Sequence, residues 1–328
     1  MINCTGNDRS PVDSVQRTAR HFSKGTRASV LRLILFYWIL IYSSIAFANY
    51  NYQWRNFTRY QDGLTSNTIR KIVVGKTGQV WVATDQGLLR FDGFWHQVPL
   101  AAPSSENLGV SPAQISILDL LVDRRGNLWI ATNIGIFIGQ WPSDRQQMVW
   151  TSFQTQKTGL LADYISVITE RRNGEVWVGT PVGVCWQRLG DKSWQKVQTP
   201  YVTGIYEDLQ NQLWLAHQPA SRVADGLALL TLIEPDGKNW QLFGTQDGLP
   251  NGQIQAMVTD RQNRLWVGTT KGLVIYNEQK WSADFRSLDL IGHNVQTLHF
   301  DQNQILWVGT NQGIRLLIDL NSGDEVAY

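Results

Sequence analysis

A short segment centred on a tryptophan occurs six times between residues 78 and 310, and this repeat constrains the fold more than any other feature of the sequence. In each copy the tryptophan follows Leu or Val and precedes an aliphatic residue, then Gly or Ala, then Thr or His. The six anchor tryptophans are Trp81, Trp129, Trp177, Trp214, Trp266 and Trp307. They lie 37 to 52 residues apart, a spacing that suits a four-stranded propeller blade of about 40–50 residues.

Each copy reads as three strands joined by two tight turns. Gly or Asn stands three residues before the anchor tryptophan in five copies, where it favours the positive φ of such a turn. Gln304 holds this position in the sixth copy, so we expect a shifted or less regular turn there. The first strands are predicted at Ile69–Val74, Ile115–Val122, Ile165–Ile168, Val202–Tyr206, Ile254–Val258 and Val295–Phe300. A glycine marks the second turn in five copies, at Gly87, Gly135, Gly183, Gly272 and Gly313.

A second set of tryptophans marks a fourth strand in the first five copies, at Trp95, Trp150, Trp194, Trp240 and Trp281. The sixth copy ends near Ile318 without one, but a similar pattern occurs at Tyr52–Phe57, around Trp54. We therefore expect an all-β, six-bladed propeller of four-stranded blades. The N-terminal strand is expected to pair beside Ile314–Ile318, completing the last blade and closing the ring without an open edge. The tryptophans are expected to pack between blades, because their large side chains fill such wedges well.

The N-terminal region has the pattern of an export signal. Residues 33–48 form an uncharged, mostly apolar run that follows Arg27 and Arg32 and ends in Ala46-Phe47-Ala48. A basic stretch, a short apolar run and an Ala-x-Ala ending indicate a signal peptide cleaved after Ala48. We divide the chain into a polar basic stretch at 1–29, which suggests a true start codon near Val30, a signal peptide at 30–48 and the propeller at 49–328. An uncleaved signal anchor in the inner membrane is the alternative, and either reading places the propeller in the periplasm.

Charge and cysteine content limit the function further. The whole chain has a net charge of +2, but residues 49–328 carry 23 basic and 25 acidic residues, a net of −2. A body without a basic stripe argues against nucleic-acid binding. Only two cysteines occur. Because Cys4 precedes the cleavage site, Cys185 is left without an intramolecular partner, and its apolar neighbours predict a buried thiol.

The repeat also resembles a known family. The run Gly63-Leu-Thr-Ser-Asn-Thr-Ile, then Gly78-Gln-Val-Trp-Val-Ala-Thr, then Gly87-Leu-Leu-Arg-Phe-Asp-Gly is similar to the two-component regulator propeller repeat, and residues 50–318 follow its pattern. Members of this family are extracytoplasmic sensor regions of bacterial signalling proteins, usually followed by a membrane span and a histidine kinase or diguanylate cyclase. No such output follows Ile318, which leaves three expectations open: a stand-alone periplasmic sensor, a truncated gene, or a propeller whose output lies on a partner protein.

The sequence shows little that is typical of an enzyme. No serine-hydrolase elbow, phosphate-binding loop, zinc-protease motif or Cys-x-x-Cys occurs. Four aspartates lie six residues before an anchor tryptophan, and their place beside a turn predicts capping hydrogen bonds; they are Asp123, Asp208, Asp260 and Asp301. We therefore expect no catalytic residues, metal or cofactor. An exported lyase or hydrolase and a protein-interaction scaffold are the alternatives.

Candidate binding residues come from the loops that share one end of the predicted blades. Loops between second and third strands lie beside the loops that enter the next blade, and such loops carry function on a rigid scaffold. The loop at His217–Asp225 is longer than its equivalents. An unknown small molecule, glycan or peptide is the expected ligand. The candidate ligand-binding residues are Asn67, Asp163, His217, Arg222, Asp225, Asn251 and His293.

The signal-peptide interpretation makes a direct prediction. The exported protein should begin at Asn49, because peptidase cleaves after the small residue that ends the Ala-x-Ala motif. N-terminal sequencing of a C-terminally tagged product checks this. A matched variant with Ala48→Arg should block cleavage, and a wild-type product that retains residues 33–48 would instead support the anchor.

Overall fold

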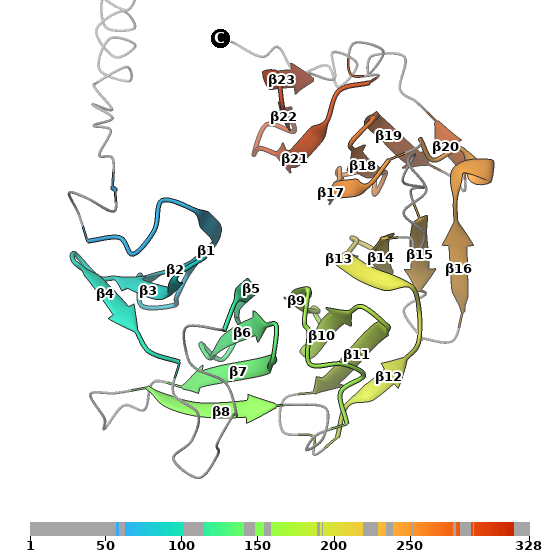
Figure 1. Cartoon of the computed structure of the whole chain (residues 1–328). Helices are drawn as coiled ribbons and strands as arrows, with labels where there is room; N and C mark the ends of the chain where they lie inside the picture. The colour runs from blue at the N-terminus through green and yellow to red at the C-terminus, as the bar shows by residue number, and fades with distance from the viewer. Residues whose placement is uncertain are drawn as a thin grey trace, which may run out of the picture. The chain divides into compact units, whose positions relative to one another are not determined.

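A computed structural model describes residues 57–58, 63–100, 115–140, 148–153, 159–188, 191, 193–218, 229–233, 239–250, 252–277, 280–282, 290 and 292–317. These residues form antiparallel β-sheets with a single 3₁₀ turn at Thr245–Asp247 (Figure 1). The sheets all lie within one compact unit that spans Phe57–Tyr328. The all-β propeller class predicted from the repeat is therefore confirmed.

Five sheets have four strands, and in each the strands pair in sequence order. The first comprises β1 (Ile69–Val74), β2 (Val80–Thr84), β3 (Gly87–Phe91) and β4 (Trp95–Val98), and the second β5 (Ile117–Val122), β6 (Leu128–Thr132), β7 (Gly135–Gln140) and β8 (Val149–Phe153). The third comprises β9 (Val167–Glu170), β10 (Glu175–Thr180), β11 (Gly183–Arg188) and β12 (Gln195–Val197). The fourth comprises β13 (Tyr201–Glu207), β14 (Leu213–Gln218), β15 (Leu229–Ile233) and β16 (Trp240–Phe243), and the fifth β17 (Ile254–Thr259), β18 (Leu265–Thr269), β19 (Gly272–Asn277) and β20 (Lys280–Ser282). A final sheet comprises β21 (Val295–Phe300), β22 (Leu306–Thr310) and β23 (Gly313–Leu317).

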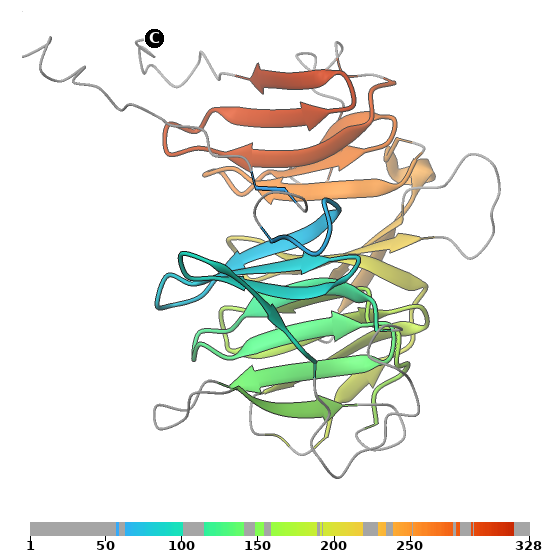
Figure 2. The same ribbon diagram turned by 60° about the vertical axis from the view of Figure 1, so that its left-hand side comes forward.

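Consecutive sheets stack through their faces (Figure 2). The first strand of each sheet is the innermost (Figure 1). The first strands are neighbours in series, with β1 next to β5, β5 next to β9, and so on to β17 next to β21. Between sheets lies a dry core. One sheet supplies its anchor tryptophan and an aliphatic residue of its third strand, such as Trp81 and Leu88. The next sheet supplies apolar residues of its first strand, such as Ile117 and Leu120. The predicted role of the anchor tryptophans in packing between blades is confirmed at these junctions.

An aspartate ties four of the six anchor tryptophans to the turns that precede them. Asp208 Oδ1 accepts hydrogen bonds from the backbone N–H groups of Gln210 and Gln212, both at 2.9 Å, and its Oδ2 accepts from Trp214 Nε1 at 3.0 Å. The same arrangement recurs at Asp123, Asp260 and Asp301. The predicted turn-capping role of these aspartates is confirmed, with an indole donor that the sequence pattern did not reveal.

The turns have the backbone geometry that the glycine and asparagine positions predict. Gly126 has a φ of 90° and Asn211 a φ of 62°. The expectation of an irregular turn in the sixth copy is wrong, because Gln304 has a φ of 61° and its N–H donates to the Asp301 carbonyl at 3.1 Å, as in the other copies. The aspartate cap holds the turn in register even where the residue with positive φ is a glutamine.

The prediction of six four-stranded blades in a closed ring is wrong. Among the described residues, five blades have four strands, and the final sheet, β21–β23, has three. The segment around Trp54 that was expected to complete it lies outside the described residues. Phe57, at the end of that segment, packs on the first blade, with ring centroids 5.3 Å from Phe91 and 5.4 Å from Trp95. The sequence pattern of an outer strand did not specify which sheet its aromatic residues contact.

The predicted signal peptide at 30–48 and the stretch before it also lie outside the described residues. In the part of the chain that the structure does describe, no helix is long and apolar enough to cross a membrane.

The aspartate cap predicts a measurable difference between an interior blade and the final sheet. Asp208→Ala leaves three donors without their acceptor in a site where the side chain is 2% exposed, so we expect a loss of about 3 kcal/mol in the free energy of unfolding. Asp301→Ala is the matched control, because its partner Trp307 is 42% exposed and water can replace the lost bonds. Denaturant unfolding of both variants measures the difference, and equal losses would contradict the role assigned to burial.

Candidate functional site

The turns between second and third strands, together with the loops that enter each first strand, form one end of the sheets, which we call the entry face. In five copies a threonine hydroxyl donates to the carbonyl of the turn glycine at 2.7–3.1 Å. The same oxygen accepts from the N–H two residues further on. The threonines are Thr84, Thr132, Thr180, Thr269 and Thr310. Each turn is thus fixed from within, which gives the loops around it a rigid base.

Reciprocal hydrogen bonds join these turns to the entry loops. Ser116 N donates to Asn133 Oδ1 at 2.8 Å, and Asn133 N donates to the Ser116 carbonyl at 3.2 Å. Asn294 and Asn311 repeat this pair of bonds in the final sheet, at 3.3 and 3.2 Å. The entry loops are therefore held in fixed positions relative to the sheets they lead into.

The structure places four of the seven candidate residues. Asn67 is exposed and Asp163 is half-buried, each in the loop that enters a first strand. His293 is half-buried in the entry loop of the final sheet. His217 lies at the end of β14. Arg222, Asp225 and Asn251 lie outside the described residues, so the predicted long loop at 217–225 is not described. A binding role for these seven residues stays a prediction.

Two polar atoms of adjacent entry-face residues are buried without a hydrogen-bond partner in the described part of the chain. They are Nδ1 of His293 and Oδ1 of Asn294. Buried polar atoms are nearly always paired with protein or water. A donor and an acceptor left together at the rim of the entry face are therefore groups that water or a ligand can satisfy.

An aromatic pair stands next to candidate Asp163. Tyr164, which is 39% exposed, meets Tyr201 of β13 edge-to-face, with ring centroids 6.3 Å apart. Burial, together with a hydrogen bond to Tyr164, raises the pKa of Tyr201 to about 12. The Tyr201 phenol therefore stays neutral at physiological pH, and Tyr164 presents an apolar ring with a polar tip next to Asp163. The sequence analysis missed this pair, although both tyrosines precede a predicted first strand.

His217 replaces the turn threonine in the fourth blade, and both of its ring nitrogens have hydrogen-bond partners within the protein. Its side chain is buried, with Nδ1 3.1 Å from the Pro200 carbonyl and Nε2 2.7 Å from Thr231 Oγ1. The imidazole therefore bridges the start of β13 and the middle of β15, where the other blades use a Thr–Gly bond. Burial lowers the pKa of His217 to about 4, and the bond to Pro200 only partly opposes this. The ring is neutral at pH 7.

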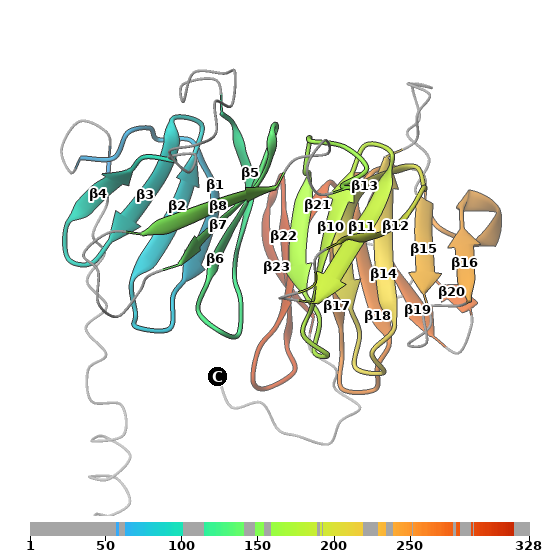
Figure 3. The same cartoon turned by 90° about the horizontal axis from the view of Figure 1, so that it is seen from below.

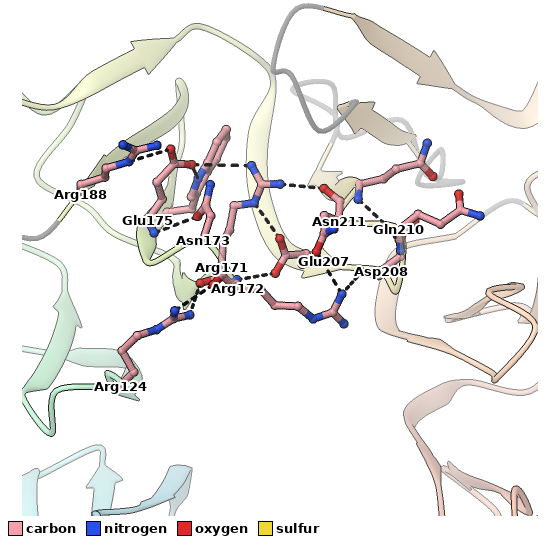
Figure 4. Close-up of polar contacts among 12 residues, drawn as sticks. Arg124, Arg171, Arg172, Asn173, Glu175, Arg188, Glu207, Asp208, Gln210 and Asn211 are labelled. Carbon is pink, nitrogen blue, oxygen red and sulfur yellow. Dashed lines mark hydrogen bonds and ion pairs between the residues drawn. The ribbon is translucent and has the colours of Figure 1, made fainter.

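The turns between first and second strands lie at the opposite end of the sheets (Figure 3). Several of these turns carry a network of arginines (Figure 4). We call this end the hairpin face. Arg171, which is 4% exposed, stands where four other copies have the capping aspartate. Its guanidinium is 3.0 Å from Glu207 Oε1, 3.7 Å from Glu175 Oε2 and 2.7 Å from the Asn211 carbonyl. Glu175 Oε2 takes over the missing aspartate's role by accepting from Trp177 Nε1 at 3.2 Å.

Long basic side chains in these turns also reach the next blade. Arg124 donates to the carbonyls of Arg171 and Arg172, at 2.6 and 2.8 Å, and pairs with Glu170 at 2.8 Å. Arg172 donates to the Asp208 carbonyl at 2.7 Å (Figure 4). Lys76 likewise donates to the Arg124 carbonyl. The basic residue after the capping position thus connects each of these turns to the equivalent turn of the next blade. These contacts give the hairpin face a structural role.

The described residues hold no group of three or more His, Cys, Asp or Glu side chains that could bind a metal ion. Cys185 is buried and free, as expected, and burial raises the pKa of its thiol. Tyr164 and the unpartnered polar atoms of His293 and Asn294 therefore give the entry face groups that suit recognition of a polar ligand.

Comparison with known families confirms the resemblance seen in the sequence. The two-component regulator propeller family matches residues 111–133 and 248–271. These segments contain the hairpins β5–β6 and β17–β18. This all-β propeller is thus similar to two-component regulator propellers over these two hairpins. No curated protein sequence matches it significantly.

Solved structures of similar fold include the extracellular domain assigned to the hybrid two-component system BT3049 of B. thetaiotaomicron, at 18% identity and a TM-score of 0.63 over 79% of this chain and 34% of that chain. PorZ, a surface component of the type-IX secretion system of Porphyromonas gingivalis, is 19% identical with a TM-score of 0.55 over 75% of this chain and 38% of that one. The gluconolactonase XC5397 of Xanthomonas campestris is 12% identical with a TM-score of 0.49 over 76% of this chain and 86% of that one, too distant to inform function. The chain spans 34% and 38% of the first two, and these identities show a shared fold.

His217 predicts a specific dependence of stability on pH. Its folded-state pKa of about 4 lies below the ordinary value of about 6.5. The unfolded chain therefore binds a proton more readily, so the stability is complete above pH 6.5 and falls as the pH drops toward 4. The loss is about 3 kcal/mol for a shift of this size.

Urea unfolding of the wild type and His217→Gln between pH 7.5 and pH 4 measures this term as the difference between the two curves. His299→Gln, which removes an exposed imidazole from β21, is the control and should keep most of the dependence. Parallel curves for the wild type and His217→Gln would show that this imidazole does not resist protonation.

Proposed function

We propose that this protein is an extracytoplasmic sensing propeller that binds a polar ligand on its entry face. The observation that carries the proposal is the match of two separate hairpins, in the second and fifth blades, to the two-component regulator propeller. Likeness to an extracellular domain of a hybrid two-component system agrees with this reading at the level of fold. The periplasm is the compartment that fits the basic and apolar pattern of residues 27–48.

The geometry of the entry face supports the location of the ligand site. Threonine-fixed turns and reciprocal entry bonds give a rigid rim, and a rigid rim lowers the entropic cost of binding. Tyr164 with Asp163, and His293 with Asn294, offer one stacking surface and several hydrogen-bonding groups. An aromatic ring beside a carboxylate suits a glycan or a peptide, whose apolar faces and hydroxyl or amide groups alternate.

We further propose that the output lies on a partner, a membrane histidine kinase or diguanylate cyclase. A binding event that favours one arrangement of the blades can change such a partner only if the partner contacts the propeller differently in the two states. The proposal assigns no catalytic residue to this chain. Turnover of a ligand during the binding measurements would favour the exported lyase or hydrolase instead.

A thermal-shift screen of the purified chain with defined glycans, peptides and metabolites tests the proposal. A ligand present at 100 times its dissociation constant should add about 2.7 kcal/mol to the free energy of unfolding. Tyr164→Ala and His293→Ala should each weaken that response. Gln210→Ala is the control, because Gln210 is exposed on the hairpin face and contributes its backbone N–H to the turn.

Two results would refute the proposed function. One is a panel in which nothing stabilises the protein, together with no kinase or cyclase recovered with it from its native membrane. The other is a stabilising ligand whose effect is lost with Gln210→Ala and retained with both entry-face variants, because the site would then lie on the hairpin face.

A further inference from the structure

In the part of the chain that the structure describes, each of the two outermost faces of the series of sheets exposes apolar side chains. On the final sheet, Trp307, Ile314 and Leu316 are 42%, 72% and 47% exposed. On the first strand of the first sheet, Ile69, Ile72 and Val74 are 40%, 57% and 63% exposed. We call these the trailing face and the leading face. Clustered exposed apolar residues of this kind mark interaction surfaces more often than isolated ones do.

The trailing face carries residue types that every other blade covers. The other five anchor tryptophans are 0–3% exposed, whereas Trp307 is 42% exposed. Ile314 corresponds by register to Leu88 and Ile136, each next to the turn glycine, and these are 1% and 0% exposed. Trp307 and Ile314 thus form one half of the interface that joins consecutive blades.

The leading face carries the other half. Ile69 and Ile72 pair with Thr84 and Val82, as Ile117 and Leu120 pair with Thr132 and Ile130 in the second blade. Ile117 and Leu120 are 1% and 2% exposed because they pack against Trp81 and Leu88 of the first blade. Nothing equivalent covers Ile69 and Ile72 in the described part of the chain.

Each chain therefore presents one copy of both halves of an interface that it already forms within itself. We propose that the trailing face of one molecule binds the leading face of a second copy, head to tail. In this contact Trp307, Ile314 and Leu316 pack against Ile69 and Ile72, as Trp266, Leu273 and Ile275 pack against Val295 and Leu298 between the fifth blade and the final sheet. A head-to-tail contact uses two different surfaces, so it can continue from molecule to molecule.

The self-association is independent of the ligand proposed for the entry face, because none of its contact residues belongs to that face. It predicts dimers and larger species of the purified chain whose proportion rises with concentration. Ile314→Lys damages the trailing face and Ile72→Glu damages the leading face. Each should raise the dissociation constant at least about tenfold, because an unpaired charge would be buried in the contact.

Sedimentation velocity on the full chain and on mixed variants provides a sharp test. Each variant alone should be monomeric, and an equimolar mixture should form dimers but nothing larger, because it contains one intact pair of faces. Phe94→Lys is the control: Phe94 is 78% exposed at the β3–β4 hairpin, away from both faces, and this variant should associate like the wild type.

Three results would overturn the proposal. Wild-type protein that stays monomeric at every concentration would exclude the contact. This conclusion would hold even if fluorescence quenching showed that Trp307 is shielded within the molecule. Association of Ile72→Glu alone with loss only in Ile314→Lys would indicate that two trailing faces bind each other. A mixture of the two variants that stays monomeric would show that the faces do not complement one another.

Discussion

The packing of each anchor tryptophan between two sheets is the interaction on which the rest of the structure depends. An indole placed at that junction removes a large apolar area from water on both sides. Its N–H must still find an acceptor, and the aspartate six residues earlier supplies one in four of the six copies. The same carboxylate caps the turn, so a single residue satisfies the indole, fixes the hairpin and sets the register of the strand that carries the tryptophan.

In the third blade, where the aspartate is absent, the network is rebuilt from other residues. Arg171 replaces it in the third blade, and Glu175 then accepts from the indole while Glu207 of the next blade balances the arginine. His217 similarly replaces the turn threonine in the fourth blade and recruits Thr231. Arg171 and His217 lie in neighbouring blades, and each is matched by a second residue that restores the lost hydrogen bonds. A buried polar group without such a match would cost stability.

Much of the fold could be predicted from the sequence because the repeat reports local structure directly. The first strands at Ile69–Val74 and Val295–Phe300 have the bounds that their apolar runs indicated, and the turn residues at Gly126 and Asn211 have the positive φ expected of them. The number of complete blades could not be predicted in the same way. The pattern around Trp54 predicts an outer strand. Which sheet such a strand joins depends on contacts between residues far apart in sequence. Phe57 packs on Phe91 and Trp95, and no pattern in the sequence identifies those partners.

The candidate binding site could be predicted from the sequence only in part, for a related reason. Asn67 and Asp163 were found by their equivalent positions in the repeat, which also fix their place on the entry face. Burial of His217 was not apparent, because a histidine in place of a threonine looks like an exception with a function until its two ring nitrogens are seen to be occupied. The arginine network was missed although the sequence contained a signal for it: Arg171 interrupts the run of aspartates at one fixed position.

The basic side chains that fasten one turn to the next have a consequence for how such a chain can change in evolution. Arg124 and Arg172 end on main-chain carbonyl oxygens of the following blade. Every residue type offers that acceptor, so a blade gained, lost or exchanged by recombination brings a usable docking point whatever its sequence. Gene duplication can therefore change the number of blades without requiring a new side-chain partner at each new contact between blades.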